Sequence, residues 1–524
     1  MAEILTGEEL AKQHREISIS EFFEKNKHLL GFDNPTKALL IVVKEAVDNS
    51  IDACNEAGIL PRIIVKVKNV ENDVFRVMIE DNGPGVPRDK LAKTFGKFLY
   101  GSKFHRLRQS AGQQGIGITG SILYGQLTTG KPAKIWSKTA KEKKTNYVEL
   151  MIDVTKNESH IIKQEEIEGR GEIKEHGVRI ELEIVGRYRR TQSIDDYLEQ
   201  VSISNPYAEI IYYAPDGRKV VYSRAVKELP KLPKEIKPHP YGVELGIFLR
   251  MLKRTKAKTI SSFLINEFSS IGAKTAEKAC KEARIKKDRK PQELTNEEAK
   301  KLLHVLQSMD IQRPPLDCLS PIGEEALKKG LLKHYQNAEF IATVTREPNV
   351  YRGNPFQIEA AIVYDPTLSS GDSVKLIRFA NKAPLLYQQG ACAIFKAVVE
   401  TDWKRYGLDH RKGSLPTGPY VIVVHLASVW VPFISEGKEA IANYPIIIKE
   451  IKLALQKVAR KLAIYLSGKR REHQKRRRFE LFQRYAPEIG ESLSKLTGAP
   501  KDKIIKKLDE LIRERIKIED TKEN

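Results

Sequence analysis

The start of the chain alternates apolar and polar positions in the way that an α/β unit requires. Segments 62–70 and 74–81 alternate with a period of two, which predicts two half-buried strands. Residues 34–58, just before them, carry apolar side chains at helical spacing, which predicts an amphipathic helix. An Asp-Gly turn between two later apolar runs predicts a closing hairpin. We therefore expect an α/β unit over residues 1–225.

The pattern changes twice after this unit. Four prolines within residues 226–240 predict an extended linker, and residues 241–310 then read as short helices separated by turns. Strand patterns return from residue 311 and are interrupted by a helical segment near 391–402, so a second α/β unit is expected over 311–465.

A long helix is predicted from about residue 445. Its apolar side chains recur at spacings of three and four, which indicates a seam packed on a neighbouring element: Ile448, Ile451, Leu455, Val458, Leu462 and Tyr465. The seam then meets charged residues while the helical composition continues. We expect residues 466–524 to form a stalk that leaves the body of the protein, with a tail after it.

The charge balance favours a polyanionic partner. The formal net charge is +22, and neutralising phosphates releases condensed counterions, although a lysine-rich proteome would give the same composition. The four cysteines form no CxxC pair, so neither a zinc knuckle nor a disulfide framework is expected. No apolar run approaches the length of a membrane span, and the N-terminus lacks the apolar core of a signal peptide. The sparse cysteines fit a reducing compartment, and a cytoplasmic protein is expected.

The first predicted helix carries polar side chains on one face. Glu45, Asn49 and Asp52 fall at i, i+4 and i+7. A carboxylate one turn from an amide is suited to polarising water beside Mg²⁺, because the carboxylate takes a proton and the amide oxygen is a hard ligand. An ordinary amphipathic helix with a solvated face would show the same spacing.

Two glycine-containing segments follow. The strand ending at Asp81 runs into Asp-Asn-Gly-Pro-Gly, where a carboxylate can accept a hydrogen bond from an exocyclic amine and Gly85 lets a flat base approach the backbone; a tight turn would look alike. Further on, Gly112, Gly115 and Gly117 precede an apolar helical run, which is typical of a phosphate-binding loop at a helix N-terminus, or of a mobile loop. Neither a Walker A sequence nor a Rossmann turn is present.

The order and spacing of these three motifs resemble the GHKL superfamily of DNA gyrase B, MutL, ninety-kilodalton heat-shock chaperones and histidine kinases. The resemblance implies a Bergerat-fold α/β sandwich that binds ATP and Mg²⁺. By motif position, Glu45 would be the general base, Asn49 the Mg²⁺ ligand and Asp81 the adenine reader. The resemblance implies further nucleotide contacts from Gly85, Gly101, Ser102, Gly112, Gln113, Gln114, Gly115, Ile116, Gly117, Ile118 and Thr119.

One position departs from the superfamily. A Gly-Thr pair usually supports the adenine from a later strand, whereas this chain has Gly177-Val178. Because valine has no side-chain hydrogen-bonding group, a looser or reorganised adenine pocket is expected. The departure also leaves open a DNA-binding scaffold that has lost hydrolysis.

The remainder of the chain resembles B subunits of topoisomerase VI, the type IIB DNA topoisomerases. The carriers are INEFSSIGAKTAEKA, which resembles their helix-two-turns-helix insert, and FLYGSKFHRLRQ, KPHPYGVEL and ETDWKRYGL. The resemblance implies a transducer domain whose switch residue, Lys438, reaches the γ-phosphate and takes part in catalysis. It implies an A₂B₂ heterotetramer with a DNA-cleaving A subunit, which the tail at the end of residues 466–524 would bind. It also implies ATP-dependent dimerisation of B subunits through a strap at residues 1–20, and passage of a DNA duplex. A chaperone or mismatch-repair ATPase is the alternative.

Contacts with double-stranded DNA are expected from two basic regions, although a solvated helix would look similar to the second. One interleaves aromatic and basic residues, and the other is the basic run of the stalk. The residues are Trp403, Lys404 and Tyr406 in the first, and Lys469, Arg470, Arg471, Arg476 and Arg477 in the second.

Overall fold

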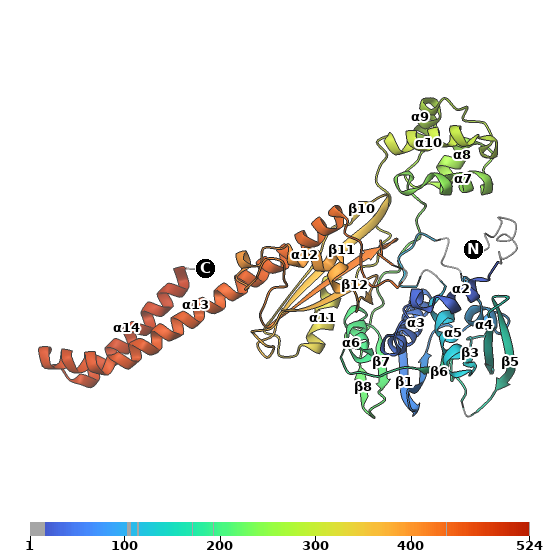
Figure 1. Cartoon of the computed structure of the whole chain (residues 1–524). Helices are drawn as coiled ribbons and strands as arrows, with labels where there is room; N and C mark the ends of the chain where they lie inside the picture. Colours follow the sequence, from blue (N-terminus) through green and yellow to red (C-terminus); the bar gives the residue numbers. More distant parts are fainter. Residues whose placement is uncertain are drawn as a thin grey trace, which may run out of the picture.

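The computed structural model describes residues 16–101, 106–112, 115–169, 171–191, 193–435 and 437–522, with side chains as far as residue 512. It contains a first sheet unit, a small helical unit, a second sheet unit and a long helical arm (Figure 1). The predicted class, α/β with several units and a long C-terminal helix, is confirmed. In the described part of the chain, no helix combines the length and apolar character needed to cross a membrane.

The first unit is an eight-stranded sheet with helices packed on one face (Figure 1). The strand order is β5-β4-β3-β6-β2-β1-β7-β8, and among these described strands only β1 and β7 pair in parallel. Its helices are α2 (Ile19–Lys25), α3 (Pro35–Glu56), α4 (Arg88–Gly96), α5 (Gly117–Thr129) and α6 (Ile194–Ser204). Its strands are β1 (Arg62–Glu71), β2 (Val74–Asp81), β3 (Ala133–Lys138), β4 (Thr145–Asp153), β5 (Glu158–Ile167), β6 (Gly177–Val185), β7 (Glu209–Tyr213) and β8 (Lys219–Tyr222).

The alternating pattern of β2 explains why helices cover only one face. Every second residue of this strand is buried, from Phe75 to Asp81, as expected for a sheet with one packed face. The buried side chains meet the apolar side of α3, whose first turn is capped by Asn34 and begins with Pro35. The packing holds the polar face of α3 in a fixed position above the sheet.

Four short helices form the small unit, with an apolar core of their own. They are α7 (Leu245–Arg254), α8 (Ile260–Glu267), α9 (Ala273–Ala283) and α10 (Asn296–Ser308). Ser269 to Gly272 form the turn between α8 and α9, and Ser270 takes a positive φ of 61° there.

The second sheet unit is covered on both faces. Helix α11 packs against one face, and α12 and α13 pack against the other. Its elements are α11 (Glu324–His334), β9 (Phe340–Thr345), β10 (Asn349–Tyr351), β11 (Asn354–Tyr364), β12 (Lys375–Ala380), β13 (Ala383–Pro384), α12 (Ala393–Val399) and β14 (Tyr420–Ser428). All of β14 is buried, as a central strand between two helical layers should be.

The arm consists of α13 (Pro445–Thr497), a helix of 53 residues, and α14 (Lys501–Lys522). The predicted seam is buried against the second sheet, and α13 then projects away from the body (Figure 1). Helix α14 folds back along it in a hairpin. This hairpin was not predicted, because its contacts join residues on opposite sides of a turn at Gly498.

Candidate nucleotide site

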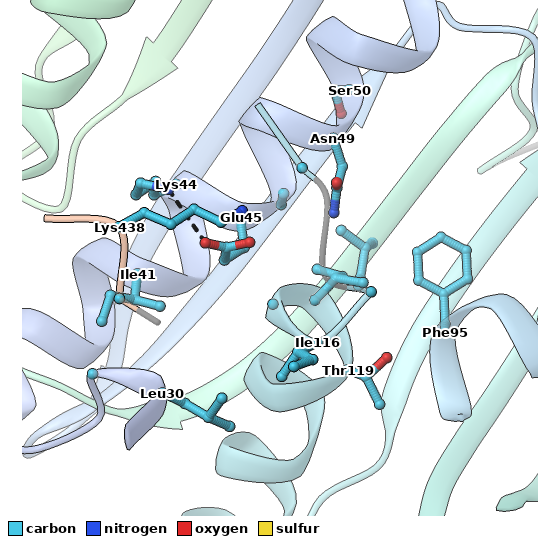
Figure 2. A pocket seen from close by; sticks show the side chains of 18 of the residues that line it. Leu30, Ile41, Lys44, Glu45, Asn49, Ser50, Phe95, Ile116, Thr119 and Lys438 are labelled. Carbon is cyan, nitrogen blue, oxygen red and sulfur yellow. Dashed lines mark hydrogen bonds and ion pairs between the residues drawn. The ribbon is translucent and has the colours of Figure 1, made fainter. Parts of the chain in front are cut away.

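The polar face of α3 lines a cavity of about 590 Å³ (Figure 2). Glu45 and Asn49 come from α3, and Asp81 comes from the end of β2. Lys438 enters from the loop after β14, in the second sheet unit. The wall is completed by Val86, Gly101 and the described residues of the segment 112–119, the glycine-rich loop and helix start that we call the lid. The structure thus brings the separate sequence motifs to one cavity.

Glu45 lies between two lysines. Its Oε1 accepts a hydrogen bond from Lys44 Nζ at 3.3 Å, and Lys44 also reaches Asp48 at 3.0 Å. Burial alone would raise the pKa of Glu45, but the charges of Lys44 and Lys438 outweigh it and hold that pKa below its usual value. Glu45 is therefore ionised at neutral pH and able to accept a proton.

The lid approaches this carboxylate closely. A Cβ on Gly117, the first residue of α5, would lie 1.8 Å from Glu45 Oε2. Gly112 donates its backbone N–H to Asp52 at 3.2 Å and lies beside Asn49 Oδ1. Gly115 has a positive φ of 57°. Only glycine allows the start of a helix, with its free N–H groups, to come this close to the acidic face of α3.

The structure describes some of the predicted lid and pocket residues but not others. Ile116, Ile118 and Thr119 line the cavity with the glycines of the lid. Gln113, Gln114 and Ser102 lie outside the residues whose side chains are described, as does most of the predicted strap at residues 1–20.

Asp81 is buried at the other end of the cavity and is satisfied by three donors. Its Oδ1 accepts the backbone N–H groups of Gly83, at 2.8 Å, and Val178, at 3.1 Å, while Oδ2 accepts the Ser50 hydroxyl at 2.7 Å. Burial raises its pKa despite these hydrogen bonds. A Cβ on Gly85 would lie 2.1 Å from the Lys138 carbonyl oxygen, so glycine is required there.

The departure at Val178 does not leave Asp81 without support. The hydroxyl group that valine lacks is provided to Asp81 by Ser50, from α3. Ser50 was not predicted from the sequence, although it directly follows Asn49 and interrupts an otherwise apolar side of the helix. Val178 contributes its backbone N–H to Asp81 and an apolar side chain to the cavity wall.

Lys438 links the two sheet units at the site. Its Nζ donates to the backbone oxygen of Ala111 at 3.0 Å, and Figure 2 shows its side chain beside Lys44 and Glu45. Burial lowers its pKa, which the Glu45 carboxylate partly offsets. A second link joins the same two sheet units, because Lys37 of α3 pairs with Glu439 at 2.6 Å. The roles of Lys44, Lys37 and Glu439 were not predicted, since only the fold shows which charges meet.

The cavity suits Mg²⁺ only together with phosphate oxygens. Among the described residues, no group of three or more His, Cys, Asp or Glu side chains gathers as a metal site. Mg²⁺ commonly takes one or two protein ligands and completes its shell with substrate phosphates and water. Asn49 beside the lid fits this requirement as a single protein ligand.

The predicted DNA contact at Trp403 is wrong. Its indole is fully buried in the core beneath α13 and donates Nε1–H to the Val398 backbone oxygen at 2.7 Å. Its neighbour Tyr406 is partly buried against the same core, so Lys404 alone of the three predicted residues is exposed. An aromatic residue enclosed in this way cannot stack on or grip a nucleic acid.

The stalk residues are exposed on the arm, but some are already engaged. Lys469 contacts the Glu339 carboxylate and lies 5.1 Å from the centre of the Tyr364 ring. Arg470 donates to the Gly407 backbone oxygen at 3.4 Å. Further out, Arg476 and Arg477 are exposed, and Arg476 pairs with Glu480 one turn away at 3.3 Å.

Comparison with known proteins agrees with this geometry. The sequence profile described as "Histidine kinase-, DNA gyrase B-, and HSP90-like ATPase" matches residues 37–177, which hold α3, β2 and the lid. The chain therefore contains an ATPase unit of this superfamily. A second profile, "Topoisomerase VI B subunit, transducer", matches residues 314–478.

Relatives define the family more narrowly. The B subunit of type 2 DNA topoisomerase 6 from Archaeoglobus fulgidus is 49% identical over 88% of this chain and 76% of its own length. Its counterpart of the same name from Pyrococcus horikoshii is 37% identical over 98% of both chains. Among solved structures, the B subunit of DNA gyrase from Myxococcus xanthus matches with a TM-score of 0.43 and 10% identity, over 85% of this chain and 95% of that one. The chain belongs to the family of type 2 DNA topoisomerase 6 B subunits. This result argues against the alternative of a chaperone or mismatch-repair ATPase.

Proposed function

We propose that the chain binds ATP with Mg²⁺ between α3 and the lid and hydrolyses it as the B subunit of a type IIB DNA topoisomerase. The observation that supports this most is the convergence of Glu45, Asn49, Asp81 and Lys438 on one cavity. Asp81 would accept the adenine amine on Oδ2, next to Ser50. The lid, with its N–H groups at the start of α5, would bind the phosphates.

The chemistry follows from the environment of Glu45. Its ionised carboxylate would accept the proton of the attacking water, and Lys44 would hold it in position. Mg²⁺ on Asn49 would offset charge on the phosphate oxygens. Lys438 would contact the γ-phosphate. Because the same ammonium group is hydrogen-bonded to Ala111 of the first sheet unit, the contact between the two sheet units would depend on which nucleotide is bound.

At the level of the assembly, we propose the arrangement expected from the sequence. Residues 1–225 would form the ATPase domain with its strap, 226–240 the linker, 241–310 the helix-two-turns-helix domain, 311–465 the transducer and 466–524 the stalk and tail. Two B subunits would dimerise on ATP, enclose a DNA duplex and couple hydrolysis to its passage through a break made by two A subunits. The chain would act in strand passage only within this A₂B₂ complex.

Glu45→Gln tests the assignment of the base. The variant keeps the side-chain volume and loses the proton acceptor, so hydrolysis should fall by at least about 100-fold. Binding of a fluorescent ATP analogue should stay within a few fold. Asp89→Asn, an exposed carboxylate on α4, is the matched control and should leave both quantities unchanged. Turnover near that of the unaltered protein in Glu45→Gln would remove Glu45 from this role.

Sedimentation with nucleotide tests the gate. A non-hydrolysable ATP analogue should shift the protein from monomer to dimer, and ADP should not. A sedimentation coefficient that is the same with both nucleotides would contradict ATP-driven dimerisation while leaving hydrolysis itself intact.

A further inference from the structure

A second cavity, of about 390 Å³, adjoins the nucleotide cavity where the two sheet units meet. Both cavities are lined by Lys44, Pro384 and Lys438, so these residues form the boundary between them. The other walls come from the segment before the lid, the turn between β12 and β13, and the loop after β14. The remaining lining residues include Ser110, Ala111, Asn381, Trp430, Ile434 and Ser435.

The lining of this second cavity favours a small anion. It has two ammonium groups and, among the described residues, no carboxylate. The carboxylate partners of Lys44, Glu45 and Asp48, do not line it. A cation that faces low-dielectric walls attracts an anion more strongly than it would in water. Inorganic phosphate has the charge and the size for this space, whereas the adenine-binding Asp81 lies only in the first cavity.

The second cavity also opens to solvent. Trp430 is 43% exposed and Ile434 is 48% exposed, and Ser435 beside them is exposed as well. These three residues of one loop form the mouth. The second cavity therefore extends from the boundary at Lys44 and Lys438 to exposed residues of this loop.

Hydrogen bonds within the second sheet unit and between the two units hold the segments around the second cavity in place. Asn381 donates Nδ2–H to the backbone oxygens of Ser110, at 3.1 Å, and Ser428, at 3.0 Å. Gln109 and Ser320 exchange two hydrogen bonds, at 2.9 and 2.8 Å. The hydrogen bond from Lys438 Nζ to the Ala111 oxygen joins two residues that line the second cavity, and one side-chain rotation can break it.

We propose that the second cavity is the exit path for inorganic phosphate, with the Lys438–Ala111 hydrogen bond as its inner gate. The proposal rests on the proposed hydrolysis of ATP at Glu45. Phosphate leaves past Lys44 and Lys438 and out between Trp430 and Ser435, while ADP stays in the first cavity. Phosphate and ADP then leave by different paths. The departure of phosphate acts directly on the loop after β14, because Lys438 of that loop lines the path.

Ser435→Trp tests the path, because it places a bulky side chain at an exposed position of the mouth. Phosphate release is followed in single turnovers with a fluorescent phosphate-binding protein, cleavage by rapid quench, and ADP release with a fluorescent nucleotide. Release of phosphate should slow at least about tenfold, with cleavage and ADP affinity unchanged. Ser370→Trp, an exposed serine of the same unit outside the cavity, should behave like the unaltered protein.

Trp430→Ala gives the opposite change, since it widens the mouth, and phosphate release should be at least as fast as in the unaltered protein. Phosphate release at the normal rate in Ser435→Trp would overturn the proposal, as would slower release in Trp430→Ala. Loss of the cleavage step in Ser435→Trp would also overturn it, because the loop would then act in catalysis. Absence of cleavage in the unaltered protein would instead remove the proposed ATPase function.

Discussion

At the scale of single residues, the site depends on how little space separates α3 from α5. The Glu45 carboxylate lies where a side chain on Gly117 would have to be. Glycine is therefore required at this position by lack of space and not by backbone conformation. Catalysis requires reacting groups to be placed within a fraction of an ångström, and a displacement of about 1 Å can cost 10²-fold.

Gly117→Ala should therefore abolish hydrolysis by displacement. The added methyl group would push Glu45 away from the lid, so single-turnover cleavage should fall by about 100-fold or more. Gly272→Ala, where nothing lies within 4 Å of the added Cβ, should have wild-type cleavage. Cleavage within about twofold of the unaltered protein in Gly117→Ala would show that Glu45 does not need its observed position.

The charge of Lys44 helps to keep Glu45 ionised over a wide pH range. The folded protein holds the pKa of Glu45 below its usual value, so the proton-accepting form persists to acid pH. Lys44→Met leaves burial and one lysine, Lys438, so the pKa of Glu45 should rise. The acid limb of the pH profile of cleavage should move to higher pH in Lys44→Met and stay in place in Lys44→Arg. An unmoved limb in Lys44→Met would show that a different group controls it.

At the scale of elements, α13 contains two glycines whose replacement by alanine should change the stability of the arm in opposite directions. On Gly490, a Cβ would lie 2.5 Å from Ile505 Cγ1 of α14, whereas around Gly468 nothing lies within 4 Å. Both sit in α13, where alanine is intrinsically favoured over glycine by about 1 kcal/mol. Replacing glycine by alanine at Gly468 therefore measures helix propensity alone, whereas the same change at Gly490 also measures the packing of α13 on α14.

Gly468→Ala should stabilise the arm by up to about 1 kcal/mol, and Gly490→Ala should lose that gain to overpacking that typically costs about 1–3 kcal/mol. Hydrogen exchange of the amides in α14 measures the difference, with faster exchange expected only in Gly490→Ala. Equal exchange in the two variants would mean that α14 does not depend on this close contact.

Sequence patterns predicted the elements well wherever local periodicity decides them. The helix with Glu45, the strand ending at Asp81 and the buried seam of α13 follow from spacing alone. Spacing could not show that Lys44 pairs with Glu45 or that Ser50 supports Asp81, because those contacts depend on side-chain direction within a packed fold. The prediction that Trp403 contacts DNA was wrong for the same reason, because basic neighbours in the sequence do not show that the indole points into the core.

At the scale of the whole molecule, the net charge of +22 favours binding to DNA, and the exposed arm offers the clearest contact surface. Counterion release predicts that the logarithm of affinity falls linearly with the logarithm of salt concentration, with a slope of about 0.9 for each phosphate contacted. Basic residues already held against the body of the protein should contribute less than those exposed further along the arm.

Replacing both Arg476 and Arg477 by alanine should reduce the salt slope of duplex-DNA binding by about 1.8. Lys469→Ala should change it less, because Lys469 already contacts Glu339. Fluorescence anisotropy with a labelled duplex at several salt concentrations measures both. A slope unchanged in the double variant would place the DNA contacts elsewhere.

The length of α13 has a mechanical consequence. Its base packs beside the sheet unit that supplies Lys438, and its 53 residues extend for about 80 Å at about 1.5 Å per residue. A rotation of only about 10° at that base would carry its tip through about 14 Å, more than the width of a DNA major groove. The helix has the geometry of a lever arm, in which a small rotation at the base becomes a displacement as wide as a DNA groove at the far end.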